Sequence, residues 1–278
     1  MLFSYRWLQT YFNEQLPEPK KLANLFTFHS FEVEEVLTEG DDAVFEIAIL
    51  PNRRHDCLSH RGIAREISVL TGIPLARDPF REKIPKWNTP DTLVASIDDA
   101  DGAPRYMTAL MRGVSVGESP DWLKERLRAI GQKPKNNIVD ATNYVMFELG
   151  QPLHVFDAEK FTKEGDTIKI GVRNAKEGEL ITALGGDEYI LDKNDLIIVD
   201  GVSDSPLGIA GIKGGTACEI SSQTKNIIIE SANFDPARVR ATATRLGLRT
   251  DASARFESGL APEQAAHALK EVIMLIEK

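Results

Sequence analysis

Apolar residues near the start of the chain recur in short blocks that predict the helices and strands of a small domain. Ser4 is a good helix cap, and the residues Trp7, Leu8, Tyr11 and Phe12 after it fall on one face of a short helix. The pattern then predicts a helix from Pro19 to about Phe28, strands over 31–37 and 44–49 joined by a tight turn over 38–42, and a helix over 61–71 that Gly72 ends. We therefore expect a first domain over residues 1–75.

Residues 76–91 contain three prolines and little periodicity, which is typical of an extended linker. Beyond it, strands are predicted over 92–97 and 105–111, and a helix over 120–130 with Ser119 as its cap. A further helix over 138–149 should end at Gly150.

The region from 167 to 230 predicts a β-rich core, because short apolar runs alternate with Gly and Asp turns. Strands are expected over 168–172, 189–191, 196–199 and 226–230, followed by helices over 236–246, 253–258 and 262–277. The fold class is therefore α+β: a small helical and strand N-terminal domain, the linker over 76–91, and a larger mixed β-core domain over 92–278 with flanking helices.

Net charge modifies this picture, because a formal value of −9 argues against a general nucleic-acid binder. Two local basic clusters contrast with that average: Lys124, Arg126, Arg128, Lys133 and Lys135, and then Arg238, Arg240, Arg245, Arg249 and Arg255. They fit either the solvated faces of two helices or a basic rim around a site that receives an RNA end.

The cysteines and the apolar runs indicate the cellular compartment in which the protein is expected. The two cysteines, Cys57 and Cys218, lie far apart in the sequence, as expected for a reduced, cytoplasmic protein without disulfides. The start of the chain lacks the features of a secretion signal, and no apolar run approaches the roughly 20 residues that cross a bilayer. His55, Cys57 and His60 lie close in sequence but lack a fourth ligand at workable spacing, so we expect no metal site.

Polar groups inside apolar segments indicate a candidate ligand pocket. Thr142 and His154 are on a helix and in the loop after it, within a run otherwise fit for a core. Burial of such groups is unfavourable unless they find partners. The glycine-rich turn over 208–215 lets the backbone approach a ligand closely. Glu230 ends a strand directly after three isoleucines, so its carboxyl should be partly buried.

Each candidate also has a structural reading. Thr142 can bond a carbonyl one turn back in its own helix, and His154 can be a satisfied structural histidine. The turn over 208–215 lacks the phosphate-binding spacing and fits a tight hairpin. Glu230 fits an edge-strand charge, or a partner of Arg238 or Arg240.

Ordered motifs across the whole chain resemble the beta subunit of bacterial phenylalanyl-tRNA synthetase. They include Ser4-Tyr5-Arg6-Trp7-Leu8, Pro51-Asn52-Arg53, Ala103-Pro104-Arg105-Tyr106, the stretch from Asn136 to Phe156, Glu230-Ser231-Ala232-Asn233-Phe234, and Arg255-Phe256-Glu257. The matches correspond to the N-terminal domain and the editing module of that subunit.

The resemblance implies a function. In that family the editing module hydrolyses tyrosine wrongly esterified to tRNA(Phe). Carried over by position, Thr142 and His154 match editing-site residues, Ala210 and Gly211 match the lining of the amino-acid pocket, and Glu230 matches the acid that recognises the tyrosine hydroxyl. The implied partners are the acceptor end of tRNA(Phe) and the synthetase alpha subunit. The segment itself would need no cofactor, whereas the complete synthetase uses ATP and Mg.

Two departures from the family pattern leave alternatives open. A tight turn over 39–42 stands where the family usually carries an oligonucleotide-binding insertion, and the chain lacks the family's later domains. Lys213 replaces a common methionine and makes the pocket mouth more basic. The chain is thus expected to be a hydrolytic editing part of the subunit, a non-catalytic assembly and tRNA-positioning module, or a free-standing deacylase that acts in trans.

Overall fold

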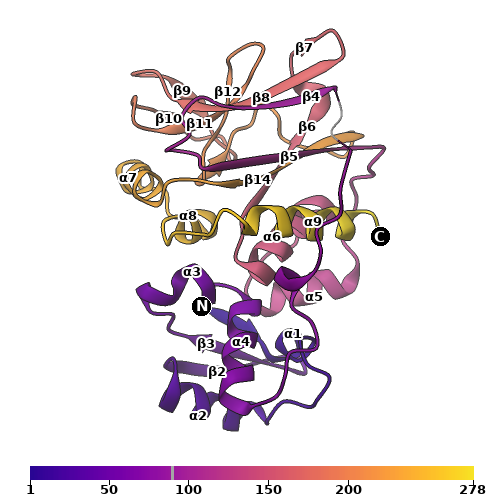
Figure 1. The fold of residues 1–278 in the computed structure, drawn as a ribbon, viewed down its shortest axis with the longest axis vertical. Helices are drawn as coiled ribbons and strands as arrows, with labels where there is room; N and C mark the ends of the chain where they lie inside the picture. Colours follow the sequence, from indigo (N-terminus) through magenta and orange to yellow (C-terminus); the bar gives the residue numbers. More distant parts are fainter. Residues whose placement is uncertain (89–90) are drawn as a thin grey trace. The chain divides into compact units, whose positions relative to one another are not determined.

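Helices and strands are mixed along the chain in the computed structural model, which describes residues 1–88 and 91–278 (Figure 1). This arrangement confirms the predicted α+β class. Two compact units are present, and each combines separate stretches of sequence. Unit 1 contains Met1–Lys83 and Glu118–Gly150, and unit 2 contains Ile84–Gly117 and Gln151–Lys278.

Unit 1 is built around a three-stranded antiparallel sheet in the order β1-β3-β2. Its elements are β1 (Leu2–Ser4), α1 (Tyr5–Gln9), α2 (Pro19–His29), β2 (Val33–Glu39), β3 (Asp42–Ile47), α3 (Arg54–Cys57), α4 (His60–Thr71), α5 (Asp121–Ala129) and α6 (Asn137–Leu149). Ser4 caps α1, and Gly72 and Gly150 end α4 and α6 in left-handed conformation, as predicted. Ser119 does not cap α5: the N-cap residue is Pro120, and the Ser119 hydroxyl instead donates to Asp140.

A buried aromatic column explains why the segment 118–150 belongs to unit 1. The Trp7 ring stacks on His60 at 3.8 Å and on Tyr144 of α6 at 4.6 Å between ring centroids. The Trp7 indole also donates to the buried carboxylate of Glu148. Because these contacts join α1 to α6, the compact units divide the chain differently from the predicted domains 1–75 and 92–278.

The first half of the predicted linker 76–91 is anchored to unit 1. Asp78 is buried and accepts two hydrogen bonds, at 2.6 and 2.9 Å, from the partly buried Arg61 guanidinium. The same guanidinium lies 4.0 Å above the Phe80 ring. The linker prediction is therefore wrong for residues 76–83, because proline content does not reveal a buried ion pair. Residues 89 and 90 of that prediction lie outside the described residues.

Unit 2 contains two larger sheets in separate layers (Figure 1). The six-stranded sheet follows the order β13-β12-β11-β8-β4, with β7 beside β8; the other sheet follows the order β5-β14-β6, and β9 and β10 form a two-stranded hairpin. The strands are β4 (Leu93–Ile97), β5 (Arg105–Arg112), β6 (Leu153–Asp157), β7 (Lys163–Glu164), β8 (Thr167–Asn174), β9 (Leu180–Thr182), β10 (Glu188–Ile190), β11 (Leu196–Asp200), β12 (Pro206–Ile209), β13 (Lys213–Gly214) and β14 (Asn226–Asn233).

Strand β14 is the centre of the three-stranded sheet and presents its two faces to different neighbours. One face packs on α9 (Gln264–Ile276), where the Ser231 hydroxyl donates to the Ala265 carbonyl. The opposite face carries Ile228 and Ala232 into the main apolar core, together with Ile197 and Ile209 of the six-stranded sheet. Helices α7 (Pro236–Leu246) and α8 (Asp251–Phe256) complete the unit. The core therefore lies between the two sheets.

Within residues 1–88 and 91–278, no helix combines the length and the apolar character required to cross a bilayer.

Removing the buried Asp78 carboxylate should destabilise unit 1 much more than removing an exposed one. We expect Asp78→Ala to lower the free energy of unfolding by about 3 kcal/mol, because the Arg61 guanidinium is left buried without its partner. Asp41→Ala removes the exposed ion pair with Arg6 and should lower it by less than about 1 kcal/mol. Urea unfolding of both variants measures the difference, and equal losses would contradict the anchoring of residues 76–83.

Candidate functional site

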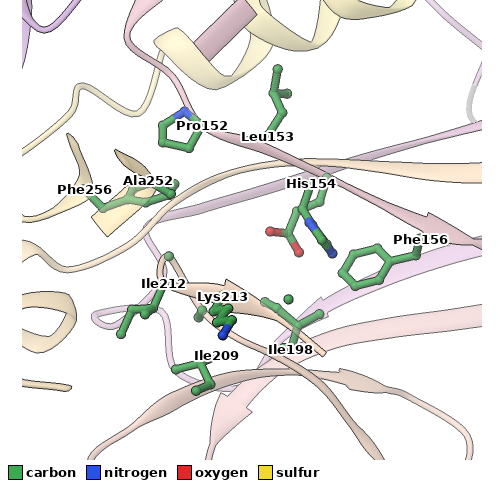
Figure 2. A pocket seen from close by; sticks show the side chains of 15 residues that line it. Pro152, Leu153, His154, Phe156, Ile198, Ile209, Ile212, Lys213, Ala252 and Phe256 are labelled. Atoms are coloured by element: carbon green, nitrogen blue, oxygen red, sulfur yellow. The ribbon is translucent and has the colours of Figure 1, made fainter. Parts of the chain in front are cut away.

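One cavity of unit 2 contains most of the residues predicted for the pocket. It has about 450 Å³ free of protein atoms, its open mouth included. The lining residues come from β6, β11, β14, α8 and the β12–β13 hairpin: Pro152, Leu153, His154, Phe156, Ile198, Gly208, Ile209, Ala210, Gly211, Ile212, Lys213, Gly214, Glu230, Ala252 and Phe256. Figure 2 shows His154 and Phe156 on one wall, with Ile198, Ile209 and Lys213 across from them. The cavity thus lies between the two sheets.

His154 and Glu230 are neighbours across two strands of the same sheet. Antiparallel pairing of β14 with β6 places Glu230 directly opposite His154. Side chains of such a pair share one face of the sheet, with their Cβ atoms about 5 Å apart. Two polar groups that lie 76 positions apart in sequence therefore face the same cavity by strand register alone.

The Glu230 carboxyl is buried and has one hydrogen-bond partner. It lies in the middle of β14, because the strand runs on to Asn233 rather than ending at 230 as predicted. Only 7% of the residue is exposed, and its Oε2 accepts a 2.7 Å hydrogen bond from the Tyr106 phenol. Burial raises the pKa of Glu230 to about 7, although the hydrogen bond from Tyr106 acts in the opposite direction. The predicted pairing with Arg238 does not occur, since that guanidinium pairs with Asp99.

The His154 imidazole faces the cavity in its neutral form at pH 7. The residue is half-buried, and burial of its ring lowers the pKa of His154 to about 4. The ring packs edge-on against Phe156, with 4.6 Å between centroids. It also lies against the backbone of Gly214, where an added Cβ would lie 2.5 Å from Nε2. A glycine is therefore required at 214 to leave room for the imidazole.

The glycine-rich segment over 208–215 is both a hairpin and a cavity wall. Strands β12 and β13 pair antiparallel, with Gly208 opposite Gly214. Ala210 and Gly211 form its turn, and Gly211 has φ +72°, a conformation that other residues adopt only with strain. The Gly211 amide donates to no acceptor among the described residues. The turn thus contributes both backbone and an apolar side chain to the lining of the cavity.

Lys213 brings positive charge to the cavity. Its ammonium is 3.5 Å from the Asp187 carboxylate and 5.8 Å from the centroid of the Tyr189 ring. Asp187 is largely exposed, so this pairing is weak. The cavity lining therefore combines one cation, one acid and one neutral imidazole.

Thr142 is not among the residues that line this cavity. It lies in α6 of unit 1, and its hydroxyl donates to the Val139 carbonyl at 2.8 Å. Thr142 therefore makes the hydrogen bond within its own helix that the sequence offered as the alternative to a role in the pocket. Of the five predicted site residues, His154, Ala210, Gly211 and Glu230 come together in unit 2.

Several residues of the two basic clusters are engaged by acids. Lys124 pairs with Glu118 and Asp121, and Arg245 pairs with Asp192 and Asp195. The Arg255 guanidinium is almost fully buried and donates to the Asp251 carbonyl at 2.8 Å. A basic rim for RNA thus stays a prediction.

The residues considered for a metal have other roles. His60 stacks on Trp7, and the Cys57 sulfur accepts a hydrogen bond from Arg53 at 3.2 Å. No group of three His, Cys, Asp or Glu side chains in the described part of the chain is placed to hold a metal ion.

Residues that the sequence did not single out complete the site. Ile198 supplies an apolar wall together with Ile209 of the predicted turn, and Ala252 and Phe256 of α8 supply another. Tyr106 reaches Glu230 from the neighbouring strand β5. Period-two alternation over 105–112 indicates which residues share a face with Tyr106, but the strand that lies beside it cannot be read from that pattern.

Comparison with known proteins defines the class of this chain. Residues 102–278 match the family model described as the B3/4 domain, so the chain belongs to the B3/4 domain family.

The relatives extend this result to a particular protein. The chain is 45% identical to the phenylalanine–tRNA ligase beta subunit of Protochlamydia amoebophila over 239 residues, which are 85% of this chain and 29% of that protein. It is also 45% identical to the corresponding subunit of Syntrophus aciditrophicus over 242 residues, 84% of this chain and 28% of that protein. The resemblance to the phenylalanyl-tRNA synthetase beta subunit is thereby confirmed. The chain spans less than a third of the length of these relatives.

A solved structure shows a more distant likeness. An N-terminal fragment of the phenylalanyl-tRNA synthetase beta subunit from Pyrococcus horikoshii is 16% identical, with a TM-score of 0.43. The match covers 88% of this chain and 73% of that one.

Glu230 should make the stability of unit 2 depend on pH in a defined direction. Its pKa is about 7 in the folded chain against 4.5 for an exposed glutamate, so the folded state binds more protons between these values. Stability from this group therefore falls as pH rises from 4.5 to about 7. Glu230→Gln cannot ionise and should not show this loss. The free energy of unfolding of the variant minus that of the wild type should therefore increase by up to about 3 kcal/mol between pH 4.5 and pH 8. A difference between variants that does not change with pH would contradict the buried state of the carboxyl.

Gly214→Ala should displace the His154 imidazole, because the new Cβ would come within 2.5 Å of the ring. Gly208→Ala is the matched control, since a Cβ there finds its nearest atoms at 3.5 Å, an ordinary contact. We expect the imidazole NMR signals of His154, assigned by their loss in His154→Asn, to move in Gly214→Ala and to stay in place in Gly208→Ala. Unmoved signals in Gly214→Ala would contradict the packing of the ring on residue 214.

Proposed function

We propose that this chain hydrolyses tyrosine from mischarged Tyr-tRNA(Phe), as an editing part of the phenylalanine–tRNA ligase beta subunit. The supporting observation is the cavity in which a buried acid, Glu230, lies opposite the neutral imidazole of His154. Apolar side chains surround both groups, so the site suits an aromatic side chain that carries one hydroxyl.

The acid is suited to select tyrosine over phenylalanine. In this proposal a ligand phenol donates a hydrogen bond to the Glu230 carboxylate, and the Gly211 amide in the cavity lining donates one to the phenol oxygen. Phenylalanine lacks the hydroxyl and would leave the second oxygen of Glu230 and the Gly211 amide without a partner, at a cost of about 1–3 kcal/mol for each group. A purely apolar pocket cannot reach this discrimination, because the two amino acids differ by one oxygen. The editing pocket thereby spares the correct product.

His154 acts in this proposal as a neutral group that positions water or a ribose hydroxyl. Its pKa of about 4 leaves too little imidazolium at pH 7 for acid catalysis and makes the imidazole a weak base. A neutral imidazole still accepts one hydrogen bond and donates another. Because the aminoacyl ester is reactive, positioning a water molecule against its carbonyl carbon accounts for much of the acceleration of hydrolysis.

The partners proposed are the acceptor end of tRNA(Phe) and the synthetase alpha subunit. The Lys213 ammonium in the cavity lining is a suitable contact for the phosphate of a terminal nucleotide. The relatives are named as beta subunits, which supports an assembly with a second type of subunit.

The position of Thr142 favours a second candidate, a non-catalytic assembly and tRNA-positioning module. Its hydroxyl is bonded within α6, and Thr142 is not among the residues that line the cavity. A trans-acting deacylase is the third reading, and it shares the cavity chemistry of the first. Activity measurements separate the three.

A deacylation assay with this chain tests the proposal. Tyrosine should be released from Tyr-tRNA(Phe) faster than phenylalanine from Phe-tRNA(Phe), by about tenfold or more, because the hydroxyl adds buried hydrogen bonds. Glu230→Ala should lose most of that preference, whereas Glu188→Ala, at an exposed strand position of the same unit, should keep it. No hydrolysis by the chain, alone or with the alpha subunit added, would favour the positioning module. Equal rates with and without the alpha subunit would favour the trans-acting enzyme.

A further inference from the structure

The carboxylate that is proposed to receive a ligand phenol already holds a phenol of its own chain. Tyr106 of β5 donates to Oε2 of Glu230 at 2.7 Å, and both residues are buried. Tyr106 is not among the residues that line the cavity, although Glu230 is. Glu230 thus already accepts one hydrogen bond from a phenol, which is the kind of bond that a tyrosine ligand would make.

Strand register fixes this arrangement. In the pairing of β5 with β14, Tyr106 is opposite Ala232, two residues from Glu230 and therefore on the same face of the sheet. His154 approaches the same acid from β6 on the other side. The acid is consequently held between a phenol on one neighbouring strand and an imidazole on the other.

The second carboxylate oxygen is left for a ligand. Oε1 of Glu230 accepts no hydrogen bond from the described residues. It is also accessible to solvent, because it does not belong to the fully buried side-chain atoms that have no partner. It therefore opens towards the cavity that Glu230 lines. A carboxylate fixed at one oxygen loses little freedom when the other oxygen binds a donor.

We propose that Tyr106 is a positioning residue for Glu230: its phenol fixes Oε2, so that Oε1 accepts the ligand hydroxyl. This inference rests on the proposed function for its ligand, but the bond between the two side chains does not. Tyr106 thereby contributes to the choice between tyrosine and phenylalanine without contacting either.

The other groups around the acid are few. Titratable side chains in the cavity lining, within the described residues, are His154 of β6 and Lys213 of β13, besides Glu230 itself. The β11 and α8 walls contribute Ile198, Ala252 and Phe256, which do not titrate. His154 is neutral above pH 5, so it does not change charge in the range where Glu230 does. A change in the titration of Glu230 on altering Tyr106 therefore reports on their hydrogen bond.

The first arm of the test needs no ligand. The titration of Glu230 is followed by NMR of carboxyl-labelled glutamate, with the signal assigned by its loss in Glu230→Gln. In Tyr106→Phe the midpoint should rise by about one pH unit, because the ionised form loses a hydrogen bond. Replacement of Tyr106 by 3-fluorotyrosine, whose hydroxyl is a stronger donor in the same shape, should lower it. Tyr11→Phe, which removes a buried phenol from unit 1, is the control and should leave it unchanged.

The second arm measures the ratio of deacylation rates on Tyr-tRNA and Phe-tRNA against pH, with spontaneous hydrolysis subtracted. The wild-type preference should rise through about pH 7. In Tyr106→Phe it should fall about fivefold at pH 7, since the ionised fraction drops from about one half to about one tenth, and recover by pH 8.5.

The two arms separate the two failures. An unmoved Glu230 midpoint in both Tyr106 variants overturns the inference, whatever the activity. A shifted midpoint in a chain that does not deacylate supports the link between Tyr106 and Glu230 and overturns only the proposed function. If Tyr106→Phe loses the preference for Tyr-tRNA and does not regain it at high pH, the role of Tyr106 in specificity is overturned.

Discussion

The burial of one carboxyl group at the centre of a sheet sets the properties of the candidate site. An ionised acid in an apolar interior is unfavourable by several kcal/mol unless donors surround it. Among the described residues Glu230 has one donor, Tyr106, and its pKa lies near neutrality. The acid is therefore poised between its charged and neutral forms, and a ligand that brings a second donor favours the charged one. The selectivity of the site for a hydroxyl follows from this incomplete pairing.

The surrounding fold keeps that pairing incomplete. Three isoleucines precede the acid along β14, and α9 closes the far face of the sheet through Ser231. On the cavity side, the tight contact between His154 and Gly214 holds the imidazole against the hairpin. His154 is kept neutral by the same burial that raises the pKa of the acid. Both groups thus stay uncharged over part of the pH range in which an exposed pair would form an ion pair.

Local sequence patterns predicted much of this structure, because caps and periodicity act over a few residues. Ser4, Gly72 and Gly150 terminate helices where their chemistry indicates. The hairpin over 208–215 follows from its glycines. The resemblance to a known family indicated four residues that line the cavity, namely His154, Ala210, Gly211 and Glu230.

Features set by pairing between distant segments were not predictable in this way. Nothing local to Glu230 indicates that its neighbours are His154 on one side and Tyr106 on the other, since register is a property of the folded sheet. Thr142 was grouped with the pocket by family position, although its hydroxyl is bonded within its own helix. The buried pair of Arg61 and Asp78 likewise joins segments whose composition indicates a helix and a linker.

The central claim is that the acid at position 230 receives the hydroxyl of a bound aromatic amino acid. Binding of two non-hydrolysable analogues, tyrosine and phenylalanine each joined through an amide to the 3′ position of adenosine, tests it directly by calorimetry at pH 8. The account predicts that the tyrosine analogue binds at least about tenfold more tightly and that Glu230→Gln reduces the difference. Equal affinities of the unaltered chain for the two analogues would contradict it.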